Sequence, residues 1–535
     1  MSKAKFSPKH ERAYYSMVCF CLLVMLNYVY MTAVAKVLSI APIGFDGHII
    51  DVESDATRGL PSLQIVGLGN KAIDEAKERV KSAITNSLLE YPVKRLTINL
   101  APAELPKDGT HYDLPIALAI LTSSGQLRPE EVTDAAFAGE LALDGKLRAI
   151  RGAITMAEAA KKAGLARIYL PAANATQASL VEGIEVISTP SLRDLFLHLK
   201  QELRLSTASP LPTISQHIPA SPILDDIHGQ EQAKRALVIA AAGHHNLLLT
   251  GPPGAGKTML AKSLPSLLPA LTPEEQIATT KLYSLAGEAI DSIVTKRPFR
   301  TPHHTASRVA LIGGGSRPKP GEISLAHLGV LFLDEIPEYP RATLEALRQP
   351  LEDKQITVSR IDGHASYPAD FMLIATMNPC PCGFYGDQTR ECTCTSTQLL
   401  NYQKRLSGPL LDRIDMVVTV SRVPNSTLLE HRTMNKKQQE AALNITNLAI
   451  DMQRNRYESG SKYNSSLTSQ EARSYLALSP TVRQFLETAT SRLNMSARSY
   501  FKTLKVARTI ADLDGATDID IPHLSEALQY RLKSP

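Results

Sequence analysis

The sequence predicts an α/β protein with a parallel sheet in its middle part and only helices in its C-terminal part. Three observations carry this prediction. Strand-like and helix-like patterns alternate over residues 31–205, strands and helices alternate in the manner of a parallel sheet over 223–424, and residues 425–535 keep an amphipathic helical period. Residues 206–222 are rich in Pro and Ser and lack that period, which predicts a linker.

Particular segments justify each block. In the first block, LTINLAP (96–102) and IYLPA (168–172) are typical of strands, and LPIALAILTSS (114–124) is typical of a helix. In the last block, amphipathic patterns predict the helices of an all-helical lid over 480–493, 498–514 and 522–532.

The composition describes an ordinary globular chain of several domains. Of the 535 residues, 44% are hydrophobic and 21% are charged, which supplies enough apolar side chains for real cores. A net charge of +5 is small for this length, so it permits a local basic surface without indicating a nucleic-acid binder. The six cysteines do not form a secreted disulfide framework, which favours a reducing cytoplasm.

A glycine-rich loop lies between a predicted strand and a predicted helix. The strand NLLLT (246–250) runs directly into GPPGAGKT (251–258), and the helix MLAKSL follows. The phosphate-binding Walker A motif requires this context, because inward-turned backbone N–H groups and a helix N-terminus attract phosphate. Lys257 is expected to reach the β- and γ-phosphates of ATP, and the Thr258 hydroxyl to ligate Mg²⁺. The predicted nucleotide contacts are Gly251, Pro252, Pro253, Gly254, Ala255, Gly256, Lys257, Thr258 and Met259.

Two more apolar runs end in polar side chains. GVLFLDE (329–335) delivers Asp334 and Glu335 to the carboxyl edge of the predicted sheet, the Walker B arrangement. Asp334 is expected to hold Mg²⁺ through water, and Glu335 to polarise the attacking water. FMLIATMN (371–378) ends in Asn378, which can orient that water in the sensor 1 role. The plain alternatives are a helix N-cap for the paired acids and a turn-forming residue for the asparagine.

Two arginines are candidates for contacts with the γ-phosphate. Arg413, on the short helix of SGPLLDRIDM (407–416), is a candidate arginine finger for a neighbouring chain. Arg498 opens a helix of the last block, where it is expected to touch phosphate of its own chain as sensor 2. The alternative for the first is a surface arginine paired with Asp412 or Asp415.

The segment DDIHGQEQAKRAL (225–237) precedes the glycine loop at the spacing where an adenine pocket forms. Ile227 and Gly229 are expected to line that pocket.

With these motifs in place, the chain resembles the ComM/YifB family of magnesium-chelatase-like AAA+ ATPases. The resemblance covers almost everything from Met31 to the C-terminus. It rests on GLPSLQIVGLGNKAIDEAKERVKSA (59–83), LPKDGTHYDLPIALAIL (105–121), RPFRTPHHTASRVALIGGG (297–315), ATMNPCPCG (375–383) and SGPLLDRID (407–415).

The resemblance implies a homo-hexameric ring with its sites between subunits, in which Arg413 acts on the neighbouring subunit. It also implies an ATP-driven helicase that promotes branch migration of branched or single-stranded DNA during natural transformation, with recombination or competence proteins as partners. A function of another class is a chelatase-type ATPase that remodels a protein partner.

The first block resembles the Lon protease domain, a ribosomal-S5-like α/β fold. Active Lon enzymes carry a serine soon after a PKDG segment and a lysine further on. Here PKDG (106–109) is followed by Thr110, His111, Tyr112 and Asp113, and the later stretch offers Arg151 and no lysine. A Ser–Lys dyad needs both nucleophile and base, so we expect a scaffold or ring-forming role and no peptidase activity.

Two segments are candidates for DNA contact. Residues 296–327 are rich in Arg, Lys and His, and 356–375 has two strand-like halves around a hairpin turn at Asp362–Gly363. In AAA+ motors a hairpin before sensor 1 commonly points into the ring's pore, where basic side chains track phosphates. The alternative is that these arginines and histidines pair with carboxylates or report nucleotide state at the subunit interface. The basic residues are Lys296, Arg297, Arg300, His303, His304, Arg308, Arg317 and Lys319.

Four cysteines form two Cys-x-Cys pairs, Cys380 with Cys382 and Cys392 with Cys394, on either side of a polar loop. Four thiolates can satisfy tetrahedral Zn²⁺, and a metal could staple a loop too small for its own core. The usual zinc knuckle has a wider spacing, so a structural zinc site and reduced, metal-free cysteines both stay open.

The N-terminal extension, residues 1–30, has two interpretations. No residue from Ala13 to Ala35 is charged, and four basic residues precede this stretch, as in a membrane anchor. An anchor with its basic residues inside the cytoplasm would place the rest of the chain, with its ATP site, in a compartment without ATP. We therefore favour Met31 as the start of a cytoplasmic domain and expect no membrane association, with an anchor as the alternative.

Overall fold

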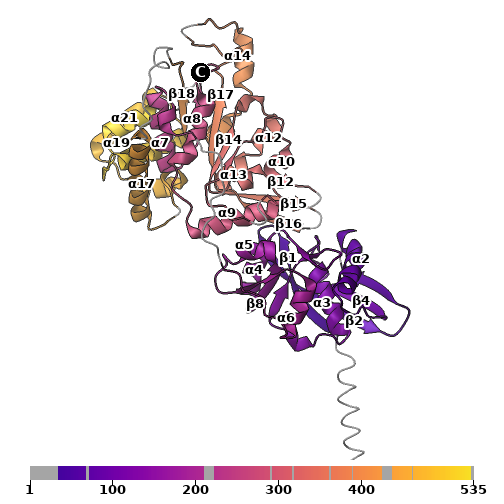
Figure 1. Cartoon of the computed structure of the whole chain (residues 1–535). Helices are drawn as coiled ribbons and strands as arrows, with labels where there is room; N and C mark the ends of the chain where they lie inside the picture. Colours follow the sequence, from indigo (N-terminus) through magenta and orange to yellow (C-terminus); the bar gives the residue numbers. More distant parts are fainter. Residues whose placement is uncertain are drawn as a thin grey trace, which may run out of the picture. The chain divides into compact units, whose positions relative to one another are not determined.

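The computed structural model describes residues 34–67, 71–209, 222–288, 292–315, 319–360, 363–387, 390–423, 437–460 and 462–531. The interpretations of residues 1–30 lie outside these residues. The chain divides into two compact units, one reaching from the N-terminus to Leu211 and the other holding most of the remainder (Figure 1).

The first unit is built on a seven-stranded mixed sheet in the order β3-β4-β2-β1-β5-β8-β9. The inner strand β2 pairs antiparallel with β1 and β4, and the remaining neighbours are parallel. The strands are β1 (Ala35–Ile43), β2 (Asp46–Thr57), β3 (Ser62–Val66), β4 (Arg95–Ala101), β5 (Ala135–Phe137), β8 (Arg167–Pro171) and β9 (Glu185–Thr189).

Helix α3 (Asp113–Ser123) forms the centre of this unit's core. Its sequence is apolar on all sides, and Asp113 through Thr122 are buried because the helix packs between the sheet strands β1 and β2 and helix α2 (Lys71–Asn86). The predicted strand at 96–102 and helix at 114–124 are present as β4 and α3. The other helices are α4 (Ala153–Lys162), α5 (Ala172–Ala178) and α6 (Leu192–Leu199).

The second unit contains a five-stranded sheet in the order β11-β14-β17-β10-β18, and every neighbouring pair is parallel. Its inner strands are almost fully buried, which explains why they read as continuous apolar runs rather than alternating ones. The strands are β10 (Leu247–Thr250), β11 (Phe299–Arg300), β14 (Val330–Leu333), β17 (Met372–Met377) and β18 (Met416–Thr419).

Helices of the C-terminal part pack against the sheet layer of the same unit, chiefly on α7 (Glu231–Gly243). A buried side chain bonds the two layers, since Gln453 Nε2 donates to the Ala242 carbonyl at 2.9 Å. The prediction of a parallel sheet followed by a helical C-terminus is confirmed. The C-terminal helices are α17 (Lys437–Tyr457), α18 (Ser469–Tyr475), α19 (Pro480–Arg492), α20 (Ala497–Leu513) and α21 (Ile521–Gln529).

A hairpin interrupts the α/β core before β17. β15 (Gln355–Arg360) pairs antiparallel with β16 (Gly363–Pro368), in a register that brings Arg360 opposite Gly363. The predicted turn position Asp362 lies outside the described residues. Within the described residues, no helix combines the length and the apolar character needed to cross a membrane.

Candidate nucleotide site

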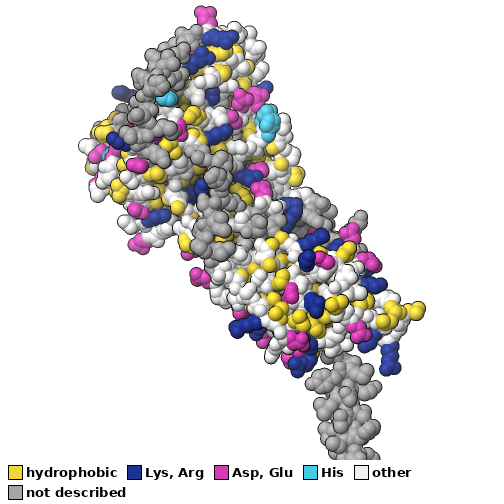
Figure 2. Space-filling view, viewed as in Figure 1, with side chains coloured by type: hydrophobic (Ala, Val, Ile, Leu, Met, Phe, Trp, Pro, Cys, Tyr) yellow, Lys and Arg dark blue, Asp and Glu magenta, His cyan; other side chains and the backbone are white. Residues whose placement is uncertain are grey.

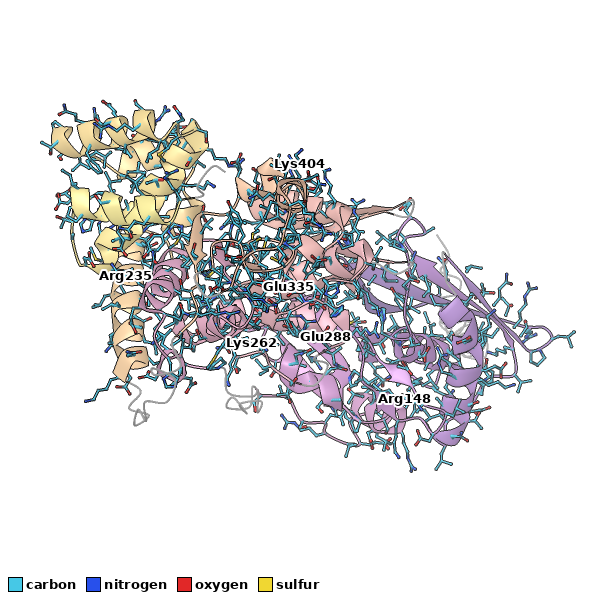
Figure 3. All side chains as sticks on the ribbon, turned by 90° about the horizontal axis from the view of Figure 1, so that it is seen from above. Arg148, Arg235, Lys262, Glu288, Glu335 and Lys404 are labelled. Carbon is cyan, nitrogen blue, oxygen red and sulfur yellow. The ribbon has the colours of Figure 1, made fainter. Side chains whose placement is uncertain are left out.

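The sheet order brings the three predicted motif segments to one edge of the second unit. β14, β17 and β10 are consecutive in the sheet, and all three run in the same direction. The glycine loop, the Asp334–Glu335 pair and Asn378 therefore follow neighbouring strands at the carboxyl edge, where ligands bind in open α/β sheets. Figure 3 labels Glu335, which follows β14, and Lys262 of helix α8 (Lys257–Ser263).

The glycine loop needs glycine at defined positions. Gly254 and Gly256 have φ angles of +75° and +88°, which side chains with a Cβ rarely adopt. At Gly251 a Cβ would lie 2.1 Å from the Val420 carbonyl oxygen, because the loop leaves β10 directly against the chain that follows β18. The loop then enters α8, whose first residue is Lys257.

Lys257 lies at the centre of the site. Its Nζ donates to the carbonyls of Gly251 at 2.7 Å and Pro252 at 3.0 Å, and to Asn378 Oδ1 at 3.1 Å. Burial lowers the pKa of Lys257, and the nearby carboxylates of Asp334 and Glu335 oppose that shift. The structure thus brings the glycine-loop lysine and the predicted sensor asparagine into direct contact.

A second cluster joins helix α8 to the acidic pair. The Thr258 hydroxyl donates to Asp334 Oδ2 at 3.1 Å, and the Thr376 hydroxyl donates to Asp334 Oδ1 at 2.5 Å. Hydroxyl and carboxylate oxygens are the ligand types that Mg²⁺ takes in proteins. Sequence reasoning missed Thr376, which lies two residues before Asn378 on β17; a hydroxyl within a buried apolar strand was the available signal.

Glu335 has an unusual backbone. Its φ of 50° and ψ of 53° are left-handed, which costs a non-glycine residue about 1 kcal/mol or more. Its N–H donates to Thr376 Oγ1 at 2.9 Å, and its side chain is exposed at the sheet edge. The acid therefore lies outside the buried strand, where solvent reaches it.

The loop before α7 is bonded to the glycine loop. Ile227 is buried, and Gly229 has a φ of +63°. Gln230, which sequence reasoning also missed, donates through Nε2 to the carbonyls of Ala255 at 3.2 Å and Ser421 at 2.5 Å. These bonds hold the predicted adenine-side segment beside the glycine loop.

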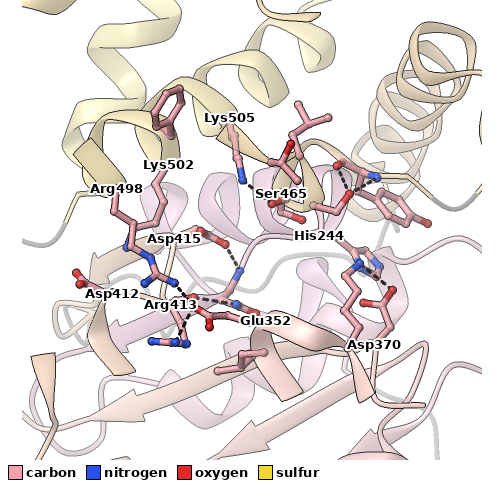
Figure 4. Close-up of a pocket in the computed structure, with 18 of the residues that line it drawn as sticks. His244, Glu352, Asp370, Asp412, Arg413, Asp415, Ser465, Arg498, Lys502 and Lys505 are labelled. Carbon is pink, nitrogen blue, oxygen red and sulfur yellow. Dashed lines mark hydrogen bonds and ion pairs between the residues drawn. The ribbon is translucent and has the colours of Figure 1, made fainter. Parts of the chain in front are cut away.

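Arg413 and Arg498 lie at the other edge of the same sheet. They line a cavity of about 560 Å³ together with Asn246 and Asp415, which stand just before the amino ends of β10 and β18 (Figure 4). Arg413 and Arg498 pair with the same oxygen of Glu352, at 2.6 Å and 2.8 Å. The glycine-loop residues do not line this cavity.

The expectation that Arg498 touches phosphate in its own chain differs from this placement. The four residues of β10 separate the two edges, a span of roughly 13 Å at the rise of a β-strand. Arg498 opens α20, which packs on α7 and so carries the arginine to the amino edge, beside Arg413. Arg413 itself is paired with Glu352 rather than with Asp412 or Asp415.

The cavity at the amino edge is rich in charge. Lys502 Nζ donates to the Ile414 carbonyl at 2.7 Å, Lys505 Nζ donates to the Ser465 carbonyl at 3.0 Å, and burial lowers the pKa of both lysines. Partial burial raises the pKa of Glu352, but its arginine partners outweigh this and hold the pKa below the ordinary value. The carboxylate is thus ionised and bridges the two arginines.

Two arginines of the predicted basic segment are bonded inside the second unit. The Arg297 side chain is only 4% exposed and donates to the Pro269 and Leu328 carbonyls as well as to Glu275. Arg300 pairs with the carboxylates of Glu288, at 2.8 Å, and Glu322, at 2.7 Å. For these two residues the structure supports the alternative of pairing with carboxylates.

The remaining basic residues of this segment have different surroundings. Lys296, His303 and Arg308 are exposed, and the rings of His303 and His304 lie 4.1 Å apart. Arg317 lies outside the described residues, whereas Lys319 is on the short strand β13 (Lys319–Pro320).

The four cysteines converge. Sγ of Cys380 lies 3.3 Å from that of Cys382 and 3.7 Å from that of Cys392, and all four sulfurs, with Cys394, lie within 4.8 Å of one another. None of them is in a disulfide.

In the first unit, the described residues that follow PKDG are hydrogen-bonded or buried. The Thr110 hydroxyl is bonded to the Glu140 carboxylate, and His111 is buried, which lowers its pKa to about 4. Arg151 is exposed to solvent. Asp113, whose pKa burial raises to about 6, pairs with Arg79 at 2.8 Å.

Comparison with known families places the chain among magnesium-chelatase-like proteins. The family described as magnesium chelatase, subunit ChlI, matches residues 223–428, a second ChlI family matches 52–174, and the ChlI C-terminal family matches 437–531. A shorter similarity, 30% identity over 183 residues, covers 29% of this chain and 32% of Lon protease 2 of Bacillus subtilis.

Several relatives are similar over nearly their whole length. YifB of Escherichia coli is 43% identical over 493 residues, covering 92% of this chain and 96% of that protein. The competence protein ComM of Haemophilus influenzae is 43% identical over 504 residues, covering 93% and 97%. The protein Rv2897c of Mycobacterium tuberculosis is 39% identical over 509 residues, covering 93% and 99%. The chain belongs to the ComM/YifB family of magnesium-chelatase-like AAA+ ATPases.

Proposed function

We propose that this chain is an ATP-hydrolysing motor whose active sites form between neighbouring copies in a homo-hexameric ring. The observation that carries the proposal is the division of the site between two edges of one sheet. Lys257, Thr258, Asp334 and Asn378 meet at the carboxyl edge, and two arginines lie at the amino edge. A single copy therefore carries both the phosphate-binding residues and the two arginines, but on opposite edges of its sheet.

At the carboxyl edge each side chain has a defined task. Lys257 binds the β- and γ-phosphates of ATP, and the hydroxyl of Thr258 with the carboxylate of Asp334 holds Mg²⁺. Glu335, exposed beside them, polarises the attacking water, and Asn378 orients that water through the contact it already makes with Lys257. Ile227 and the loop that Gln230 bonds to the glycine loop form the adenine side.

At the amino edge Arg413 reaches the γ-phosphate held by the next copy. Arg498 acts on the same neighbour, because it shares the Glu352 carboxylate with Arg413. Joining the edges of adjacent copies through a common rotation closes a ring, the geometry that a head-to-tail interface produces.

We propose further that the motor acts on branched or single-stranded DNA as a branch-migration helicase, with recombination or competence proteins as partners in the cytoplasm. The name of ComM, a competence protein, supports the biological setting. The β15–β16 hairpin and the exposed His303 and Arg308 supply candidate contacts with phosphates. On the face seen in Figure 2, Lys and Arg are interspersed with Asp and Glu.

The first unit serves as a Lon-like, ring-forming scaffold without peptidase activity in this proposal. Its support is the PKDG segment together with Thr110 and Arg151, which stand where a protease needs its serine and lysine. A second function, remodelling of a protein partner, is favoured by the match to the magnesium-chelatase ChlI families.

The deciding experiment measures ATP hydrolysis with and without a forked DNA over a range of salt concentrations. We expect DNA to stimulate hydrolysis and the stimulation to fade as salt rises, because phosphate contacts weaken with counterion concentration. Glu335→Gln protein, prepared in the same way, controls for contaminating ATPases. Equal rates with and without every DNA tested would favour the protein-remodelling function.

A further inference from the structure

The cysteine loop following β17 brings four thiols to one point. The Sγ–Sγ separations among Cys380, Cys382 and Cys392 are 3.3, 3.5 and 3.7 Å. Cys394 completes the set, since its sulfur accepts a hydrogen bond from the Cys382 N–H at 3.4 Å. The two Cys-x-Cys pairs, nine residues apart in sequence between Cys382 and Cys392, therefore face each other.

These separations fit a single tetrahedral ion. Four thiolates that each lie about 2.3 Å from a zinc ion are about 3.8 Å from one another. The sulfurs of this cluster lie close to that edge length and all within 4.8 Å, too close together for the ligands of an iron–sulfur cluster, whose irons and bridging sulfides must fit between them. A fourfold thiolate shell leaves no open position, which describes a structural site rather than a catalytic one.

The described part of the cysteine loop has no regular secondary structure of its own. Between β17 and helix α14 (Ser396–Gln403), the described residues contain no helix or strand, and Cys380 is the buried cysteine of the four. Two aromatic–cation contacts lie over one ring, since the guanidinium groups of Arg390 and Arg422 are 4.3 Å and 5.5 Å from the centre of Phe384. Zinc bound to four thiolates carries a net charge of two minus. The guanidinium groups of Arg390 and Arg422, both over Phe384 of this loop, would bring positive charge close to it.

The loop also contacts the nucleotide site directly. A Cβ at Gly383 would lie 2.6 Å from Cδ of Pro253, so the cysteine loop rests on the glycine loop with no space between them. The first cysteine, Cys380, follows Asn378 by two residues, and the hydroxyl of Tyr402 on α14 is hydrogen-bonded to the backbone of Asn378. The cysteine cluster is thus close to Pro253 of the glycine loop and to Asn378, which accepts a hydrogen bond from Lys257.

We propose that Cys380, Cys382, Cys392 and Cys394 bind one structural Zn²⁺ ion, and that this ion fixes the cysteine loop against Pro253 of the glycine loop. Binding converts the four thiols to thiolates, and their protons pass to solvent. The metal adds stabilisation to a loop that has no helix or strand among its described residues. The coupling to nucleotide binding rests on the proposed ATP site, whereas the metal site does not.

The test begins with metal content. The full-length protein, expressed with zinc and dialysed, is expected to retain about one zinc per chain by elemental mass spectrometry. Exchange with Co²⁺ should give the strong visible bands of a tetrahedral tetrathiolate complex. The double variant Cys392→Ser/Cys394→Ser should lose both signals, and Cys19→Ser/Cys21→Ser, which alters the only other two cysteines, should keep them. A wild-type protein with no more zinc than the Cys392→Ser/Cys394→Ser variant overturns the proposal.

The second measurement is the binding of a fluorescent ATP analogue to wild-type protein before and after zinc is removed by a chelator. We expect the affinity to fall about tenfold or more on removal and to return when zinc is restored, by analogy with the loss of supporting contacts at a binding site. Unchanged affinity overturns the link to the glycine loop while the metal site stands. If the zinc-loaded protein binds no nucleotide at all, the proposed ATPase function fails instead. Circular dichroism of each variant shows whether the fold is kept.

Discussion

Arg413 and Arg498 approach the same Oε1 atom of Glu352. One residue lies just before the last strand of the sheet and the other opens a helix 85 positions later in the chain, yet a single carboxylate joins them. Because the glycine loop is at the opposite edge, this placement favours the proposed role, in which both arginines act on a neighbouring copy.

This relationship predicts an unusual complementation. Arg498→Ala and Lys257→Ala should each reduce ATP hydrolysis by at least ~10³-fold in a uniform ring, the range known for a lost arginine finger. Mixing the two inactive proteins should restore partial activity, because some interfaces then combine an intact Lys257 from one copy with an intact Arg498 from the next. The measurement is the steady-state ATPase rate of mixtures at several ratios. A mixture as inactive as its components would show that Arg498 serves its own chain.

Glu335→Gln should abolish turnover while ATP binding persists. The substitution keeps the shape of the side chain and removes the charge that polarises water, a loss of at least ~10² in rate for a general base. Hydrolysis assays and binding of a fluorescent ATP analogue separate the two effects. Lys257→Ala is expected to lose binding as well, whereas Lys262→Ala, exposed on the same helix, is the matched control that should bind normally. Loss of binding in Glu335→Gln would contradict the assignment.

Thr376→Val should raise the Mg²⁺ concentration needed for half-maximal hydrolysis by about tenfold, as for a lost supporting contact of a metal ligand. The hydroxyl donates to the Asp334 carboxylate and accepts from the Glu335 backbone N–H, so its removal frees the Asp334 side chain and the backbone of Glu335. A titration of hydrolysis with Mg²⁺ measures the effect. The control is Thr446→Val, which removes a buried hydroxyl that has no hydrogen-bond partner among the described residues. An identical Mg²⁺ dependence in the two variants would count against a role for Thr376.

The stability of the second unit should depend on the neutral form of His327. Burial lowers its pKa to about 4, and its Nδ1 accepts the Asp370 N–H at 3.1 Å, which requires an unprotonated nitrogen. The unfolded chain takes up this proton near pH 6.5, so stability is full above that pH and falls as the pH drops toward 4, by roughly 1 kcal/mol per pH unit for one proton.

Denaturant unfolding of wild type and His327→Asn between neutral pH and pH 5 tests this expectation. The variant should show a shallower loss of stability with acid, by about one proton. His303→Asn, at an exposed position, serves as the control and should keep the wild-type slope. Parallel slopes in wild type and His327→Asn would show that other groups dominate.

Much of the site could be predicted because its chemistry is local in sequence. A buried strand followed by a glycine loop or an acid pair can be recognised within ten residues of sequence. A parallel sheet that contains β10, β14 and β17 then brings the residues after these strands to one edge. The helices of the C-terminal part were likewise readable from their amphipathic period, as α19 and α20 illustrate.

The remainder depends on packing between distant segments. Nothing near Arg498 in sequence indicates which edge of the sheet its helix will reach, because that is decided by how α20 packs on α7. The partners of Arg297 and Arg300 lie on other elements, at Glu275 and Glu322, so a basic segment looked available for DNA. Nothing in the sequence around Gln230 predicts that its side chain bonds to the glycine loop.

Strand β18 has a consequence for communication within a ring. Its amino end follows Arg413, the residue proposed to engage one neighbour, and its carboxyl end continues to Val420, whose carbonyl lies against Gly251. Gly251 in turn offers its own carbonyl to Lys257. β18 pairs with β10 along all four of its residues, so a displacement imposed where one copy contacts the next would be carried to the phosphate-binding loop of the first. In the proposed ring, neighbouring sites would then hydrolyse ATP one after another rather than independently, and β18 would be the mechanical link between them.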